Sequence, residues 1–155
     1  MVNKYADIII CSTDTVCGIG GPINDITLKE LYELKQRPTD KKIMILVGTL
    51  TQAQKFRQWT EKATELAEKV WPGPNSIIIN DQGFRMPDCM ELRNYLIKNG
   101  PHYMTSLNIS GDKPMSIEEG EKQFPEVANV KNFCVPSNKP STIYNLDTDE
   151  IIERE

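Results

Sequence analysis

The sequence predicts a mixed α/β fold in which a twisted sheet carries flanking helices. Apolar runs alternate with helix-start signals along the first two thirds of the chain, and toward the end short apolar runs dominate. The length of 155 residues is close to that of one domain, typically ~100–150 residues. No internal repeat or low-complexity linker divides the chain. We therefore expect residues 1–155 to form a single domain.

Apolar runs rich in isoleucine and valine predict the strands. The first run contains Ile8, Ile9 and Ile10 and passes into a polar, glycine-rich stretch over 12–21, which we expect to be a bend. After the third run, a turn over 81–83 and a short segment over 84–87 are expected. The predicted strands span residues 5–11, 43–47, 76–79, 103–107, 133–135, 142–146 and 150–152.

Helix starts are marked by a hydroxyl or carboxylate residue with glutamate three positions later. These pairs are Thr27 and Glu30, Asp88 and Glu91, and Ser116 and Glu119. The first pair predicts a helix over 27–35, which ends before Pro38. The second predicts a helix that Gly100 terminates, and the third marks the last helix start. A further helical region is expected over 51–70.

Composition excludes several classes of protein. The net charge of −4 gives no overall signal for nucleic-acid binding, and no apolar run approaches the ~20 residues that a membrane span needs. The N-terminus lacks the pattern of a secretory signal, so we expect a cytoplasmic protein. Its four cysteines form no C-x-x-C pair, and the only histidine, His102, is interpreted as structural. We expect no metal site and four reduced, mostly buried thiols.

Four polar clusters lie at the ends of predicted elements, where a rigid sheet usually displays binding groups. They are Thr13-Asp14-Thr15, Lys35-x-Arg37, Arg85, and Ser106-x-Asn108-x-Ser110. Hydroxyls and backbone N–H groups beside glycine can bind a small anion. Each cluster also has an ordinary interpretation: turn hydrogen bonds, a cation solvated at a helix end, or a surface ion pair.

Together the clusters resemble the YrdC/Sua5 family. Ser12-Thr13-Asp14-Thr15-Val16-Cys17-Gly18-Ile19-Gly20 is similar to its P-T-D-T-V-Y-G-L-G signature, with Ser12 and Cys17 as departures. Further matches follow in the family's order. They are Lys35-Gln36-Arg37-Pro38 to K-x-R-P, Trp71-Pro72-Gly73-Pro74 to W-P-G-P, Arg85-Met86-Pro87 to R-x-P, Ser106-Leu107-Asn108-Ile109-Ser110-Gly111 to S-A-N-x-S-G, and Pro140-Ser141-Thr142-Ile143 to P-S-T-I, with Arg154 on the strand that follows.

The resemblance implies a short L-threonylcarbamoyladenylate synthase, with a concave cationic face on its sheet. Such enzymes join L-threonine, bicarbonate or CO2, and ATP, release pyrophosphate, and supply a group that other proteins transfer to adenosine 37 of tRNA as t6A. Mg2+ is expected with ATP, held largely by phosphates and water. No general base stands out in the sequence, so we expect catalysis by positioning and charge stabilisation.

The resemblance also implies a role for each site residue. Lys35 and Arg37 are the expected catalytic cations on the triphosphate. The expected L-threonine contacts are Thr15, Arg85 and Ser141, with Arg85 on the substrate carboxylate. The expected nucleotide contacts are Lys35, Arg37, Ser106, Asn108 and Arg154, with Ser110 as a further candidate.

Two other functions stay open. One is a non-catalytic module that binds double-stranded RNA through the same cationic concavity, against which the net charge of −4 counts mildly. The other is a carbamoyl-transfer relative with a different acceptor, since related domains handle carbamoyl adenylates in hydrogenase maturation. The chain has no companion acylphosphatase or zinc-finger segment.

Overall fold

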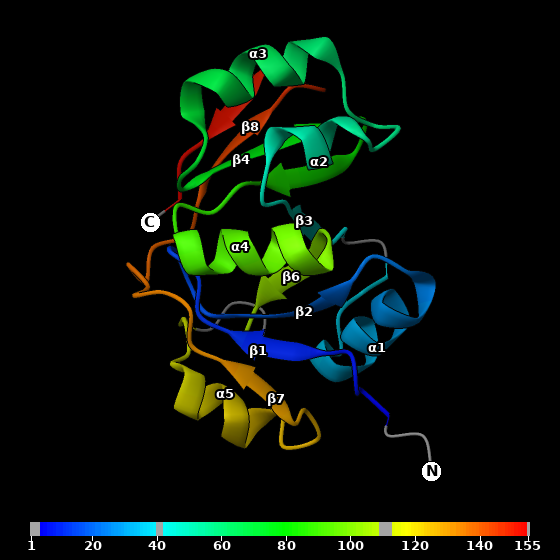
Figure 1. Cartoon of the computed structure of the whole chain (residues 1–155), viewed down its shortest axis with the longest axis vertical. Coiled ribbons are helices and arrows are strands. Elements are labelled where there is room, and N and C mark those ends of the chain that lie inside the picture. The colour runs from blue at the N-terminus through cyan, green and yellow to red at the C-terminus, as the bar shows by residue number, and fades with distance from the viewer. Residues whose placement is uncertain (1–3, 40–41, 109–112, 155) are drawn as a thin grey trace.

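A computed structural model describes residues 4–39, 42–108 and 113–154 of the chain. They form a single α/β domain around a mixed nine-stranded sheet with the order β7-β1-β2-β6-β3-β5-β4-β8-β9 (Figure 1). The fold class is the one that the sequence predicts. The strands are β1 Ile9–Cys11, β2 Gly18–Pro22, β3 Met44–Leu46, β4 Asn75–Ile79, β5 Gln82–Arg85, β6 His102–Ser106, β7 Asn129–Lys131, β8 Thr142–Asn145 and β9 Glu150–Ile152.

Five helices accompany the described part of the sheet. They are α1 Asp25–Lys35, α2 Leu50–Gln54, α3 Glu61–Val70, α4 Met90–Asn99 and α5 Ile117–Gln123. The sequence treats 51–70 as one helical region, but the structure divides it into α2 and α3 at Lys55, the C-cap of α2. No helix of the described chain is long and apolar enough to cross a membrane.

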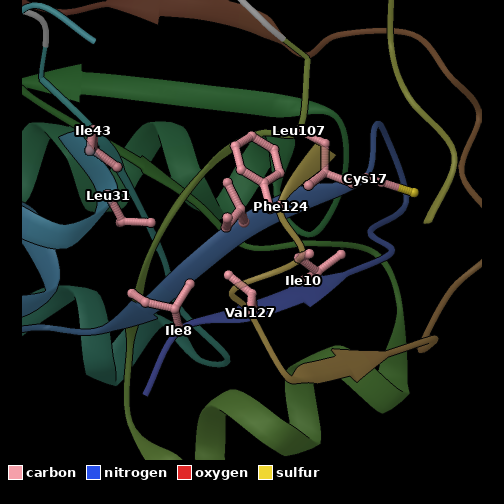
Figure 2. Packing of buried hydrophobic residues seen from close by; sticks show 9 residues of the cluster. Ile8, Ile10, Cys17, Leu31, Ile43, Leu107, Phe124 and Val127 are labelled. Atoms are coloured by element: carbon pink, nitrogen blue, oxygen red, sulfur yellow. The ribbon is translucent and has the colours of Figure 1, made fainter. Parts of the chain in front are cut away.

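Alternation along β1 explains how the helices sandwich this part of the sheet. Ile8 and Ile10 point to one face and pack with Leu31 of α1 and Phe124 at the end of α5 (Figure 2). Ile9 and Cys11 belong to another cluster, which contains Leu92 and Leu96 of α4. Successive side chains of a strand point to opposite faces, so one short apolar run packs against helices on both faces of the sheet.

The largest departure from the sequence prediction is β2, a central strand where we expect a glycine-rich bend. Gly20 pairs with Met104 of β6, and a Cβ atom at Gly20 would lie 2.0 Å from the carbonyl oxygen of Tyr103. The glycine therefore permits the close approach of two strands. A pattern of large apolar residues cannot signal such a strand.

Other boundaries differ for local reasons. Helix α1 begins at Asp25, because Asn24 caps it by accepting a hydrogen bond from the N–H of Thr27 at 2.8 Å. The predicted capping pair Thr27 and Glu30 is therefore wrong, and Thr27 is buried. Ser116 and Glu119 do form the predicted capping box of α5.

The second half of the chain contains three more corrections. The predicted turn over 81–83 is a turn at Asn80 and Asp81, both with positive φ, and residues 82–85 continue as strand β5. The N-cap of α4 is Cys89, not Asp88. Residues 133–135, predicted as a strand, form neither strand nor helix in the structure. The edge strand β7 ends just before them, at Lys131.

Cysteine usage also differs from the prediction. Cys11 and Cys17 are free and buried, as expected, whereas Cys89 and Cys134 form a disulfide with a Cα–Cα distance of 6.0 Å. The prediction of four reduced thiols is wrong for this pair. Their separation of 45 residues, with no motif between them, gave no pairing signal.

Candidate active site

Polar ends of several strands converge on one cavity of about 620 Å³. It is bounded by the turn after β1, the ends of β5 and β6, the start of β8 and the residues that follow β9. Seven of the eight predicted site residues line it. They are Thr15, Arg37, Arg85, Ser106, Asn108, Ser141 and Arg154. The eighth, Lys35, bonds to the wall formed by Ser106 and Asn108. Ser110 lies outside the described residues.

The turn after β1 forms the floor of the cavity. The hydroxyl of Thr13 donates to the carbonyl of Val16 at 2.7 Å, and its oxygen accepts from the N–H of Thr15 at 3.1 Å. The two threonine hydroxyls lie 3.1 Å apart. These bonds fix the turn from within, and Thr13 and Thr15 line the cavity.

Arg85 lies beside this floor and is only 4% exposed. Its Nη1 donates to the carboxylate of Asp14 at 2.7 Å and to the carbonyl of Gly73 at 3.1 Å, and its Nη2 donates to Thr15 Oγ1 at 3.1 Å. Asp14 also accepts from the N–H of Asp88 at 2.9 Å. The guanidinium is therefore held in one orientation by the protein, as recognition of a planar anion requires.

A second guanidinium, that of Arg154, enters the cavity from two residues beyond the end of β9. Arg154 donates from Nε to the carbonyl of Ser141 at 2.8 Å and from Nη2 to its hydroxyl at 2.9 Å. That hydroxyl lies 2.6 Å from the hydroxyl of Ser76. Burial, and then the like charge of Arg85, lower the pKa of Arg154. An anion between the two arginines would relieve their repulsion.

The end of α1 supplies two further cations. Gln36 adopts a left-handed conformation with φ 50°, and the chain turns so that Lys35 and Arg37 both reach the strand β6. Nζ of Lys35 donates to the carbonyl oxygens of Ser106, at 2.5 Å, and of Asn108. Burial, and then the charge of Arg37, lower the pKa of Lys35 to about 8.

Arg37 extends along the cavity wall. Its Nη1 donates to Thr105 Oγ1 at 3.5 Å and its Nη2 donates to the carbonyl of Lys42 at 2.9 Å. At the far wall, the hydroxyl of Ser106 donates to the side-chain oxygen of Asn108. The site therefore combines fixed cations with neutral donors and acceptors, a set that suits a ligand with several anionic groups.

Some cavity residues escape the sequence prediction. Met44 and Met104 provide an apolar wall, and Asn138 reaches the floor because its N–H donates to the carbonyl of Thr15 at 2.7 Å. Lys42 and Asp81 form an ion pair of 4.0 Å at the rim. None of these lies in a motif, and long-range folding alone brings them here.

The acid–base and metal candidates are few. His102 is buried, its Nδ1 lies 2.9 Å from the carbonyl of Gly100, and burial lowers its pKa. It does not line the cavity, which agrees with a structural role. Within residues 4–39, 42–108 and 113–154, no group of three or more histidine, cysteine, aspartate or glutamate side chains could hold a metal ion.

Comparison with known proteins places the chain in a family. Residues 3–154 match the family described as "Telomere recombination", which comprises Sua5, YciO and YrdC proteins. The chain belongs to the Sua5/YciO/YrdC family. A relative in Hydrogenovibrio crunogenus, named threonylcarbamoyl-AMP synthase, is 29% identical over 161 residues, which cover 88% of this chain and 84% of the relative. The family therefore includes threonylcarbamoyl-AMP synthases.

Solved structures of this family share the fold. YciO of Escherichia coli superposes with a TM-score of 0.82 at 18% identity, over 98% of this chain and 84% of YciO. Sua5 of Pyrococcus abyssi, solved with L-threonine, superposes with a TM-score of 0.79 at 24% identity over 94% of this chain. The chain spans 48% of the length of that Sua5 structure.

Proposed function

We propose that this chain is an L-threonylcarbamoyladenylate synthase, which makes threonylcarbamoyl-AMP and pyrophosphate from L-threonine, bicarbonate and ATP. The observation that carries the proposal is the convergence of Arg37, Arg85 and Arg154 on one cavity, together with the hydroxyl groups of its floor. ATP and a carboxylate substrate together bring more negative charge than neutral donors alone could balance. The named relatives in the family give the same activity.

The reaction divides between the two ends of the cavity. We assign the triphosphate to Lys35 and Arg37 and the adenosine to Ser106 and Asn108. Bicarbonate and the threonine amine combine to a carbamate, with loss of water. A carbamate oxygen then attacks the α-phosphorus, and the bond from that phosphorus to pyrophosphate breaks. The cations hold these anions in line and stabilise the charge that develops, as positioning catalysis requires.

At the other end, L-threonine is the proposed ligand of Thr15, Arg85 and Ser141. Arg85 is oriented by Asp14, Gly73 and Thr15, which accept from both Nη1 hydrogens and one Nη2 hydrogen, so the substrate carboxylate is proposed to bind its remaining N–H groups. Arg154 binds Ser141, and the charge of nearby Arg85 lowers the pKa of Arg154. The nucleotide contact proposed for Arg154 would therefore come from the threonine side of the cavity.

Mg2+ enters this proposal with ATP. The described cavity lining contains one carboxylate, Asp81, which is paired with Lys42. Phosphate oxygens and water would therefore provide most ligands of the ion, as is common for Mg2+ at a nucleotide. Because the reaction consumes ATP and serves tRNA through transfer proteins that add t6A, we expect the protein to work in the cytoplasm.

Pyrophosphate release tests the proposal. The purified chain should release pyrophosphate only when ATP, L-threonine and bicarbonate are all present, and Arg37→Ala should abolish the release. Arg57→Ala, at an exposed position away from the cavity, is the matched control and should retain activity. Turnover without threonine would contradict the assignment. Retention of double-stranded RNA at moderate salt without ATP binding would support the RNA-binding alternative.

A further inference from the structure

Two segments far apart in the sequence hold the floor turn over 12–15 from outside. The N–H groups of Cys134, Ser137 and Asn138 donate to Ser12 Oγ, to the carbonyl of Asp14 and to the carbonyl of Thr15, at 2.8, 3.1 and 2.7 Å. From the other segment, the N–H of Asp88 donates to the Asp14 carboxylate at 2.9 Å. The floor turn therefore lies between residues 132–141 and the start of α4.

The Cys89–Cys134 disulfide joins these same two segments. Cys89 is the N-cap of α4 and follows Asp88 directly, whereas Cys134 begins the run of amides that bind the floor turn. Both cysteines are half-buried, and the neighbouring Val135 is 92% exposed. The disulfide therefore lies closer to the surface than the buried thiols of Cys11 and Cys17.

The segment over 132–141 depends on such ties. It contains no helix or strand, yet Asn138, Pro140 and Ser141 line the cavity. Phe133 and Cys134 pack against the cluster that contains Leu92 and Leu96. The residues after them, over 135–140, are held mainly by hydrogen bonds, and such a segment opens more readily than one within a sheet. A covalent link at Cys134 restricts how far its first residues can move from the floor turn.

We propose that Cys89 and Cys134 form a reversible dithiol–disulfide pair whose oxidised state holds the floor of the cavity in place. A dithiol reductant supplies two electrons and two protons: its thiolate attacks one sulfur, the S–S bond breaks, and Cys89 and Cys134 become thiols while the reductant becomes a disulfide. Reduction removes the covalent tie of the 132–141 segment and leaves its hydrogen bonds to the floor turn. The effect on L-threonine affinity rests on the proposed function, whereas the effect on the segment does not.

Thiol counts and hydrogen exchange test the pair without any ligand. Denatured protein prepared without reductant should show two reactive thiols, Cys11 and Cys17, and four after treatment with dithiothreitol. In the folded protein, reduction should speed amide exchange of peptides over 132–141 by about tenfold, while peptides of β4 stay unchanged. Four thiols before reduction, or equal exchange of 132–141 in both states, would overturn the proposal.

Ligand binding then measures the consequence for the site. With ATP present, titration calorimetry should show that the reduced protein binds L-threonine more weakly, with a dissociation constant several-fold higher than that of the oxidised protein. The variant with Cys89→Ser and Cys134→Ser should bind L-threonine as weakly as the reduced protein does. Dithiothreitol should not change its affinity, which excludes an effect of the reagent on Cys11 or Cys17. If neither state binds ATP or threonine, the proposed function fails, and the exchange result still decides the redox pair. Equal affinities in the two states would overturn the link to the site.

Discussion

The ion pair of Arg85 with Asp14 is the residue-level feature on which the threonine end of the site depends. An isolated arginine in a sequence most often forms an ion pair at the surface. The R-x-P motif alone does not identify the residue with which Arg85 pairs. In the structure both side chains are largely inaccessible, at 4% and 13% exposure. Water cannot replace either partner there, so each charge depends on the other.

Removal of one member of this pair should destabilise the protein strongly. Asp14→Ala leaves the Arg85 guanidinium buried with its charge uncompensated, and we expect a loss of about 3–5 kcal/mol in the free energy of unfolding. Urea denaturation measures this loss. The matched control is Lys62→Ala, which breaks the exposed pair with Asp149 at 62% and 81% exposure and should cost less than about 1 kcal/mol. Equal losses for the two variants would show that burial does not matter here.

Lys35 gives the site a specific dependence on pH. Burial lowers its pKa to about 8, so the ammonium that should bind the triphosphate is lost as the pH rises through that value. We expect kcat/KM for ATP, which reports the free enzyme, to fall above about pH 8. Lys35→Arg keeps its charge and should remove this fall, whereas Lys29→Arg, at an exposed position of α1, should retain it.

The stability of the protein should show the opposite trend around Lys35. Its folded pKa lies below the unfolded value, so the unfolded chain binds more protons between the two values, and stability rises with pH in that window. The difference in unfolding free energy between the wild type and Lys35→Arg isolates this contribution from the titration of tyrosines and cysteines. A difference that stays constant from pH 7 to 10 would contradict the lowered pKa.

At the scale of elements, the glycines of β2 set how closely the central strands pack. A Cβ atom at Gly20 meets the backbone oxygen of Tyr103 at 2.0 Å, and a backbone atom in a central strand cannot move aside. We expect Gly20→Ala to cost about 3 kcal/mol or more. At Gly83 in β5, the nearest atom is the flexible Met44 methyl at 3.1 Å, and Gly83→Ala should cost less than about 1 kcal/mol. Thermal denaturation compares the two variants.

The elements predicted from sequence are those whose residues are apolar or capped in a local pattern. The strands at Ile9, Ile45 and Ile77 and the Ser116 capping box need only their own neighbours to be recognised. In contrast, β2 is mostly glycine and β5 has only one large apolar residue, Phe84, and partner strands stabilise both. Strand β7 pairs in parallel with β1, although more than a hundred residues separate the two strands in the sequence. No local sequence pattern predicts such a contact.

The same distinction applies to the site. Motifs identify Arg37, Arg85 and Ser141 because those residues carry the family resemblance. The cavity contact of Asn138 and the disulfide partner of Cys89 follow from the path of residues 132–141 across the floor turn. That path is irregular in conformation, and irregular segments have no periodicity from which a contact could be predicted.

At the scale of the whole molecule, local charge differs from net charge. The chain carries −4, yet the described cavity lining contains Arg37, Lys42, Arg85 and Arg154 against the single carboxylate of Asp81. Most acidic residues of the described chain lie outside this lining, although Asp14 pairs with Arg85 beside the floor. A concave site lined by one sign of charge attracts small anions more than it attracts a long duplex.

Because residues from both ends of the chain line this cavity, bound ATP should stabilise the whole fold. A ligand that binds only the native state at about 100 times its dissociation constant adds about 2.7 kcal/mol. For a domain of this size that corresponds to a rise in Tm of roughly 5–11 °C. Arg37→Ala should lose most of this rise at the same ATP concentration, while Lys62→Ala should retain it. Addition of L-threonine in the presence of ATP should raise Tm further, since the proposed threonine contacts lie at the other end of the same cavity. An equal shift in Arg37→Ala would mean that ATP binds outside this cavity.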